Sequence, residues 1–140
     1  MSDQDRPPPY AGGCLCGQVR YLVSTPSLNT RICHCRLCQR ATGSPFFARA
    51  VFAKAAVNIT GRTERFASSE RLWRHFCPAC GTPLFAEPAF APDRWAVTLA
   101  TLDDPDAIRP QMHIWTSSKV DWLTLDDGLP QYRESAPATP

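Results

Sequence analysis

The amino-acid sequence predicts a single, mainly β domain with little helix. Short apolar runs are rich in β-branched and aromatic residues, which is typical of strands. Glycines separate these runs, and signals for the start and end of helices are scarce. The chain has 140 residues, of which 44% are hydrophobic and 20% charged, so it can form one core and has the composition of a globular protein.

Six runs are expected to form strands, and two of them show the pattern most clearly. Long side chains alternate between two faces in 71–76, and apolar residues alternate with small or polar ones in 95–102. The other four expected strands are 18–23, 46–52, 57–60 and 111–115. A short helical turn is expected after 103–106, because Asp before Pro suits the start of a helix.

Proline-rich ends flank the predicted domain. Residues 1–9 and 134–140 are expected to be flexible tails around a folded domain that spans residues 10–133. The N-terminus is polar and shows no signal peptide, and no apolar run approaches the roughly 20 residues of a membrane helix. We therefore expect a cytoplasmic protein that does not bind a membrane. A net charge of +2 does not suggest a nucleic-acid partner.

Seven cysteines lie in three tight clusters. The clusters are a C-x-C, a C-x-C-x-x-C and a C-x-x-C, formed by Cys14 and Cys16, by Cys33, Cys35 and Cys38, and by Cys77 and Cys80. Such spacing places several thiolates around one point, which is what a tetrahedral zinc ion requires. A disulfide framework fits less well, because the count is odd and thiols in the expected compartment stay reduced.

The count of seven suggests two zinc sites of different kinds. A C-x-C paired with a distant C-x-x-C would give a closed site with four thiolates, whose natural role is structural. In an extended strand, residues i and i+2 point to the same face, so Cys14 and Cys16 could reach one ion, as could Cys33 and Cys35. Three cysteines would then remain, and three protein ligands with one exchangeable position are typical of a catalytic zinc.

Spacing leaves two alternatives open. A histidine, either His75 or His113, could close the second site and make it structural as well. His34 is a poor candidate, because it lies between two ligands and should point away from their ion. A different partition would place Cys33 and Cys35 with the C-x-x-C pair and leave the remaining cysteines elsewhere.

Three arginines, Arg31, Arg36 and Arg40, surround the second cluster in the sequence. By ligand counting, a zinc ion with three thiolates has a formal charge of about −1. The arginines could therefore offset the thiolates, or hold a carboxylate of a small anionic ligand. They could also be solvated surface residues, which is the commoner fate of arginine.

Three motifs together resemble a known family. They are Gly13-Cys14-Leu15-Cys16-Gly17, Cys33-His34-Cys35-Arg36-Leu37-Cys38, and Phe76-Cys77-Pro78-Ala79-Cys80-Gly81-Thr82. They resemble the glutathione-dependent formaldehyde-activating enzymes, a family that also includes centromere-protein-V-like proteins. The C-terminal pattern is similar too, with His113-Ile114-Trp115, Ser118-Lys119, Trp122 and Asp127-Gly128-Leu129-Pro130. The resemblance covers nearly the whole expected domain.

The resemblance implies a mainly β, Mss4-like fold stapled by two Zn²⁺ ions per chain. Cys14, Cys16, Cys77 and Cys80 would hold a structural zinc, and Cys33, Cys35 and Cys38 a catalytic one. The implied activity is that of a carbon–sulfur lyase that joins glutathione to formaldehyde as S-hydroxymethylglutathione. Such a reaction calls for a small thiol and a small aldehyde as partners. We expect the thiol to bind near the loops 36–47 and 115–119.

Other functions are compatible with the same residues. The domain could be a non-catalytic, zinc-binding interaction module or a glutathione carrier. A redox sensor is a more distant alternative, because any clustered thiolates can oxidise and release zinc. The discriminating feature is the fourth position beside Cys33, Cys35 and Cys38, which is accessible in an enzyme and closed by a protein side chain in a structural module.

Overall fold

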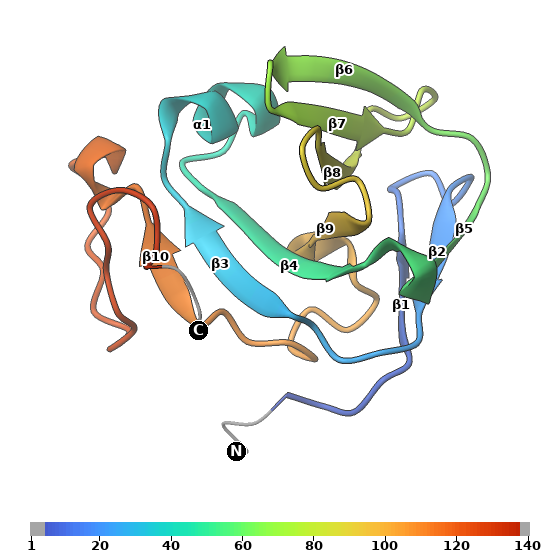
Figure 1. Ribbon diagram of the computed structural model, residues 1–140, viewed down its shortest axis with the longest axis horizontal. Coiled ribbons are helices and arrows are strands. Elements are labelled where there is room, and N and C mark those ends of the chain that lie inside the picture. Colours follow the sequence, from blue (N-terminus) through green and yellow to red (C-terminus); the bar gives the residue numbers. More distant parts are fainter. Residues whose placement is uncertain (1–4, 138–140) are drawn as a thin grey trace.

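The computed structural model describes residues 5–137; residues 1–4 and 138–140 lie outside that description. Within residues 5–137, ten strands form two sheets (Figure 1). The strands are β1 (Tyr10–Gly13), β2 (Arg20–Val23), β3 (Asn29–Cys33), β4 (Phe47–Ala53), β5 (Val57–Thr60), β6 (Glu64–Ser69), β7 (Leu72–Phe76), β8 (Pro83–Pro88), β9 (Arg94–Thr98) and β10 (Met112–Ile114). The mainly β fold that the sequence predicts is thereby confirmed.

The larger sheet has seven strands in the order β10-β3-β4-β9-β8-β7-β6, and the smaller one has the order β1-β2-β5. All pairings are antiparallel except that of β10 with β3. The larger sheet bends strongly, so that β6 and β7 lie above β4 in Figure 1. This curvature brings residues of distant strands to the same side of the sheet.

Side chains along β4 alternate between two environments, as the strand period of two requires. Ala50 and Phe52 are fully buried in the main core, which contains residues of both sheets. Phe47 belongs instead to a second, smaller core with Cys33, Cys38 and Ile114. The face of the larger sheet that carries Phe47 therefore lies outside the main core and is free to form a site.

Four of the observed strands were not expected. β1, β3, β6 and β8 contain glycine, proline or several polar residues, which weaken the strand signal in a sequence. Their strand conformation comes from pairing with neighbours, as in β8, which lies between β7 and β9. The expected strand 95–102 ends at Thr98, and a 3-10 turn, η2 (Leu99–Thr101), follows it.

The expectation of a helical turn after 103–106 was wrong. That segment makes a single turn, closed by the N–H of Ala107 and the carbonyl of Asp104. Within the described residues, the only α-helix is α1 (Arg36–Thr42). Cys35 caps its N-terminus by accepting the N–H of Cys38 on its sulfur, at 3.3 Å. Cysteine is not among the usual N-cap residues, which explains why the sequence did not reveal this helix.

Two short 3-10 turns complete the fold, η1 (Lys54–Ala56) and η3 (Thr116–Ser118). Parts of the expected tails make hydrogen bonds to the domain: the N–H of Arg6 donates to Ala107, and the N–H of Trp115 donates to Glu134. The rest of these tails, 1–4 and 138–140, falls outside the described residues. The domain limits of 10 and 133 stay a prediction.

Candidate metal centres

The structure brings four of the cysteines together, Cys14, Cys16, Cys77 and Cys80, with all four sulfurs within 4.8 Å of one another. We call them the four-cysteine group. Two sulfur–sulfur distances are 3.6 Å, from Cys14 to Cys16, and 3.7 Å, from Cys16 to Cys77. Zn–S bonds of about 2.3 Å in a tetrahedron place sulfurs about 3.8 Å apart. The group therefore fits a zinc ion, and it joins the end of β1 to the turn between β7 and β8.

Two turns rather than extended strands position these sulfurs, which corrects the expectation for Cys14 and Cys16. Gly17 and Gly81 each have a φ of 80°, a conformation that side chains disfavour. The N–H of Gly17 donates to the Cys14 carbonyl, and that of Gly81 to the Cys77 carbonyl. Each glycine thus closes a tight turn that folds the backbone around its pair of cysteines.

Thr82 links the two turns and was not singled out in the sequence. Its hydroxyl accepts the N–H of Leu15 at 3.1 Å and lies 3.1 Å from the sulfur of Cys80. Hydrogen bonds from the hydroxyl and N–H of Thr82 lower the pKa of Cys80 to about 5. This thiol is therefore largely ionised at neutral pH, as a metal ligand must be.

The other three cysteines, Cys33, Cys35 and Cys38, also lie within 4.8 Å of one another. We call them the three-cysteine group. Cys33 is the last residue of β3, Cys35 caps α1, and Cys38 lies in its first turn. The strand-to-helix transition folds the C-x-C-x-x-C motif around one point. Cys33 and Cys38 are buried, whereas Cys35 is half-buried.

Negative charge in the metal-free group is concentrated on Cys35. Hydrogen bonds from the thiols of Cys33 and Cys38, together with the charge of Arg74, lower the pKa of Cys35 to about 2. The hydrogen bond of Cys33 to Cys35 is the largest cause that raises the pKa of Cys33. The group is therefore already organised around one thiolate. Both cysteine groups could bind zinc.

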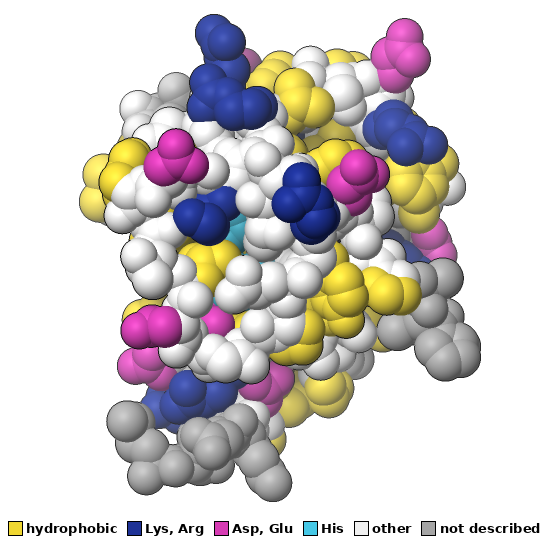
Figure 2. Space-filling model, turned by 90° about the vertical axis from the view of Figure 1, so that its left-hand side faces the viewer, with side chains coloured by type: hydrophobic (Ala, Val, Ile, Leu, Met, Phe, Trp, Pro, Cys, Tyr) yellow, Lys and Arg dark blue, Asp and Glu magenta, His cyan; other side chains and the backbone are white. Residues whose placement is uncertain are grey.

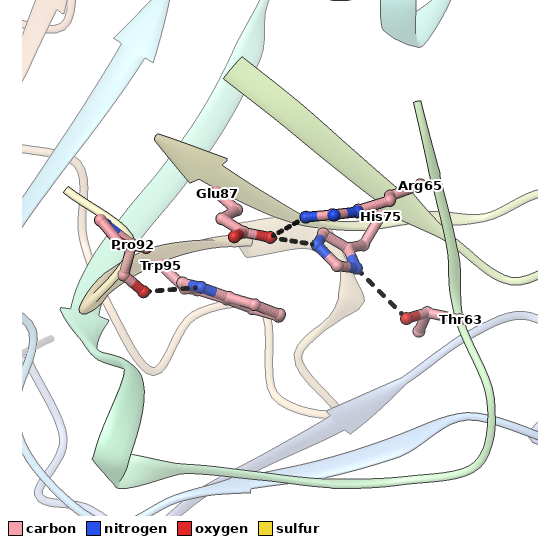
Figure 3. A network of polar contacts seen from close by, with 6 residues as sticks. All are labelled: Thr63, Arg65, His75, Glu87, Pro92 and Trp95. Carbon is pink, nitrogen blue, oxygen red and sulfur yellow. Dashed lines mark hydrogen bonds and ion pairs between the residues drawn. The ribbon is translucent and has the colours of Figure 1, made fainter. Parts of the chain in front are cut away.

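Within residues 5–137, no histidine or carboxylate joins the three-cysteine group. His75, one candidate to close it, uses both ring nitrogens elsewhere (Figure 3). Its Nε2 lies 2.8 Å from Glu87, and its Nδ1 lies 3.2 Å from the Thr63 hydroxyl. Its ring also stacks 4.5 Å from that of Trp95. The sulfurs likewise do not group as Cys33 and Cys35 with the C-x-x-C pair.

His113 is engaged in a second network. Its Nδ1 lies 2.9 Å from Nε2 of His34, and its Nε2 lies 2.7 Å from Asp127. His34 is fully buried and points away from the three-cysteine group, as expected. Burial, and then the charge of His113, lower the pKa of His34 to about 4, so its ring is neutral at neutral pH. This network joins the loop after β3 to the C-terminal segment.

A buried arginine that sequence reasoning missed lies against the three-cysteine group. Arg74 in β7 places Nη2 3.3 Å from the sulfur of Cys38 and donates from Nε to Ser68 at 2.9 Å. Its guanidinium also lies over the ring of Phe47, at 5.4 Å from the centroid. Of the three arginines expected here, Arg36 and Arg40 are exposed and Arg31 is half-buried.

Two cavities adjoin this region and share Phe47. One has a volume of about 300 Å³ and is lined by Arg74, His75 and Thr98, with Phe66 among its aromatic residues. The other, of about 510 Å³, lies along β3, β4, β9 and β8. Residues 41, 42 and 47 of the loop 36–47 region line these two cavities, and no residue of 115–119 does. The location of the thiol stays a prediction.

A family model described as glutathione-dependent formaldehyde-activating enzyme matches residues 9–118, which is more than half of the chain and includes all seven cysteines. The chain belongs to this family. The resemblance seen in its motifs is thereby confirmed. The family match also includes Arg74 and His113, whereas Asp127 lies beyond it.

One curated relative and one solved structure are similar to this chain. A curated Halomonas elongata protein named "Putative glutathione-dependent formaldehyde-activating enzyme" is 28% identical over 129 residues, covering 82% of this chain and 80% of the relative. The crystal structure of a Rhodobacter sphaeroides protein is similar with a TM-score of 0.54 and 21% identity, covering 87% of this chain and 98% of that one. At this identity, the second likeness concerns the fold alone.

The surface of this family member is mixed in character on the side that Figure 2 shows. Basic, acidic and hydrophobic side chains are interspersed there, and histidine is visible only as a small area between basic side chains (Figure 2). His34, His75 and His113 are all buried. No helix among the described residues is long and apolar enough to cross a membrane.

Proposed function

We propose that this protein is a zinc-dependent carbon–sulfur lyase that adds the thiol of glutathione to formaldehyde and catalyses the reverse reaction. The thiolate sulfur forms a bond to the aldehyde carbon, the carbonyl double bond becomes a single C–O bond, and the oxygen takes a proton. The product is S-hydroxymethylglutathione. The observation that carries the proposal is a group of three thiols that no fourth protein ligand closes within residues 5–137.

The two cysteine groups would have different roles. The four-cysteine group would hold a structural zinc, because four thiolates leave no position for a substrate. The three-cysteine group would hold the catalytic zinc. Such an ion, when bound, supplies Lewis acidity that ionises a thiol near neutral pH and polarises a carbonyl. Soft thiolate ligands also suit a sulfur-containing guest.

The protein's own side chains would prepare this site. Arg74 offsets the negative charge of the thiolates and fixes the position of Cys38 through its contact with that sulfur. Gln39 donates from its amide to the carbonyls of His34 and Ser118, at 2.7 and 3.0 Å, which holds α1 against two loops. Phe47 packs with Cys33 and Cys38 in the smaller core and lines both neighbouring cavities. These contacts would fix the ligands before substrate binds.

The site would work in the cytoplasm, where thiols are reduced and glutathione is available as a substrate. Thiols add to formaldehyde without a catalyst, so the test must measure acceleration over that background. We would follow the exchange between glutathione and S-hydroxymethylglutathione by NMR at increasing protein concentration. We expect the exchange rate to rise in proportion to the zinc-loaded protein.

Zinc content gives an independent readout of the same proposal. Freshly reduced protein should contain two zinc ions per chain, one of them labile to a mild chelator and protected by glutathione. Two inert ions and an exchange rate equal to the background would contradict the enzyme and favour an interaction module. Stoichiometric glutathione binding without acceleration would identify a carrier instead.

A further inference from the structure

The C-terminal segment 130–134 extends the larger sheet beyond β10. The N–H of His113 donates to the carbonyl of Pro130, and the N–H of Tyr132 donates to the carbonyl of His113, at 2.9 Å in each case. This parallel pairing places Gln131 beside His113. In Figure 1 the last described residues, drawn in red, lie next to β10. The family match ends at residue 118 and assigns no role to this segment.

Tyr132 lies in one row across the sheet with Cys33. Ile114 of β10 is paired with Cys33 of β3, which is paired in turn with Phe47 of β4. Tyr132 continues this row, because the residue before it is paired with the residue before Ile114. Residues in such a row have their side chains on one face, and these four all belong to the smaller core or pack against it. At about 4.8 Å per strand, the Cα atoms of Tyr132 and Cys33 are about 10 Å apart.

The backbone of Tyr132 is fixed, whereas its hydroxyl is available. Its carbonyl accepts both the N–H and the hydroxyl of Thr116, each at 3.1 Å, and its N–H is bound to β10. Within residues 5–137, every hydrogen bond of Tyr132 uses its backbone. The residue is half-buried against the smaller core. A long side chain with an unused O–H is therefore held beside the three-cysteine group.

A strained residue, Trp115, holds this arrangement. Its φ of 57° lies in the left-handed region, and among the described residues it is the only residue other than glycine with a positive φ. The turn that it makes at the end of β10 directs the N–H of Thr116 to the carbonyl of Tyr132. Its ring also packs against the smaller core. Strain of this kind persists where the surrounding structure enforces it, and it is concentrated at functional sites.

Other polar side chains of this region already use their donors. The amide of Gln39 bonds two carbonyls, the hydroxyl of Thr42 bonds the carbonyl of Cys38 at 2.7 Å, and the hydroxyl of Thr116 bonds that of Tyr132. The proposed reaction needs a donor, because negative charge develops on the aldehyde oxygen as the carbon–sulfur bond forms. A tyrosine hydroxyl is a suitable one.

We propose that Tyr132 is a further catalytic residue, whose hydroxyl donates a hydrogen bond to the aldehyde oxygen and to the hydroxyl oxygen of the adduct. When the thiolate sulfur bonds to the carbon, the electrons of the carbonyl double bond move to the oxygen, and the O–H of Tyr132 stabilises the charge there. The oxygen then takes its proton from water, so Tyr132 is unchanged. The inference rests on the proposed function and deepens it, since it names the group that acts on the aldehyde.

The first test removes the hydroxyl and keeps the ring. Tyr132→Phe should lower the protein-catalysed rate of NMR exchange about 100-fold, the usual effect of losing one donor to a developing oxyanion. The matched control is Tyr10→Phe, because the hydroxyl of Tyr10 donates to the Arg6 carbonyl from the main core; its rate should be unchanged. Both variants should keep two zinc ions per chain and native circular dichroism. Loss of a zinc ion in Tyr132→Phe would overturn the proposal in favour of a structural role.

The second test measures binding and needs no catalysis. S-(2-hydroxyethyl)glutathione and S-propylglutathione differ only by a hydroxyl in place of a methyl group, and neither has a free thiol. Calorimetry should show that the native protein binds the hydroxyethyl compound about 5–10-fold more tightly, which is the usual worth of one hydrogen bond. Tyr132→Phe should bind the two compounds equally, whereas Tyr10→Phe should keep the native preference.

The two tests separate this inference from the proposed function. Native catalysis that Tyr132→Phe retains in full would overturn the inference only, as would a preference for the hydroxyl that survives in this variant. A preference that depends on Tyr132 in a protein whose exchange rate equals the background would contradict the proposed function only. Absence of both catalysis and binding in the native protein would overturn the two together.

Discussion

Nη2 of Arg74 lies 3.3 Å from the sulfur of Cys38, and this contact couples the two cysteine groups. Arg74 is in β7, the strand that leads directly into Cys77 of the four-cysteine group. Cys38 is in α1 and belongs to the three-cysteine group. A short stretch of one strand therefore connects the two groups. Folding of the four-cysteine group positions Arg74 against the three-cysteine group.

Cys35→Ser should abolish activity and leave the domain folded. Cys35 is the half-buried member of the three-cysteine group, whereas the main core and the four-cysteine group do not depend on it. Zinc content should fall from two ions to one per chain, and the NMR exchange rate should return to the uncatalysed background. Global unfolding of this variant, seen by circular dichroism, would contradict the separation of roles.

Cys77→Ser should unfold or aggregate the protein. Cys77 is fully buried, and its group joins β1 to the β7–β8 turn. Structural zinc binding is worth about 10 kcal/mol in small domains, comparable with the whole stability of about 5–15 kcal/mol. Expression yield and thermal unfolding would measure the effect. A stable variant with native circular dichroism would rule out the structural role.

Arg74→Met should lower the catalytic rate about 10–100-fold, because the thiolates lose a neighbouring positive charge and Cys38 loses its contact. Arg74→Lys retains the charge and should recover part of the rate. Neither change removes a zinc ligand, so zinc content should remain two per chain. Equal rates for the methionine and lysine variants would show that the charge of Arg74 has no part in the reaction.

The pH dependence of alkylation should distinguish Cys35 in the metal-free protein. Its pKa is lowered to about 2, so it remains a thiolate from neutral pH down to about pH 3, whereas an ordinary thiol, with a pKa of about 8.5, is protonated there. Iodoacetamide should therefore modify Cys35 at about pH 4, where Cys80, with a pKa lowered only to about 5, is mostly protonated, and Arg74→Met should shift the Cys35 profile towards higher pH. Mass spectrometry would locate the label. A rate that rises only near pH 8 would contradict the expected ionisation.

His113→Asn should reduce the free energy of unfolding by about 2–3 kcal/mol. The substitution removes two hydrogen bonds and leaves Nε2 of buried His34 without its partner. Asp127→Asn is the matched control: Asp127 is 43% exposed, so its loss should cost less than about 1 kcal/mol. Denaturant unfolding would compare the two variants. An equal loss of unfolding free energy in the two variants would show that the buried contact between His34 and His113 contributes little to stability.

Much of the candidate site was accessible from the sequence because cysteine spacing is local. The C-x-C-x-x-C motif can converge in few ways, and the structure does bring Cys33, Cys35 and Cys38 together. The backbone at Cys33 and Cys35 is extended, as expected, but the helix that Cys35 caps and that carries Cys38 was not predicted. Different backbones can place the same three sulfurs around one point, so spacing constrains the ligands more tightly than the secondary structure.

The amino-acid sequence by itself determined the mainly β class, the number of thiols and the family. Only the tertiary structure decided that His75 and His113 are engaged elsewhere, that Arg74 contacts Cys38, and that Arg31 faces Arg49. The physical reason is the range of the interactions. Ligand spacing and strand propensity involve neighbours along the chain, whereas these contacts depend on strand register and on the bend of the seven-stranded sheet, which arise only when distant segments pack together.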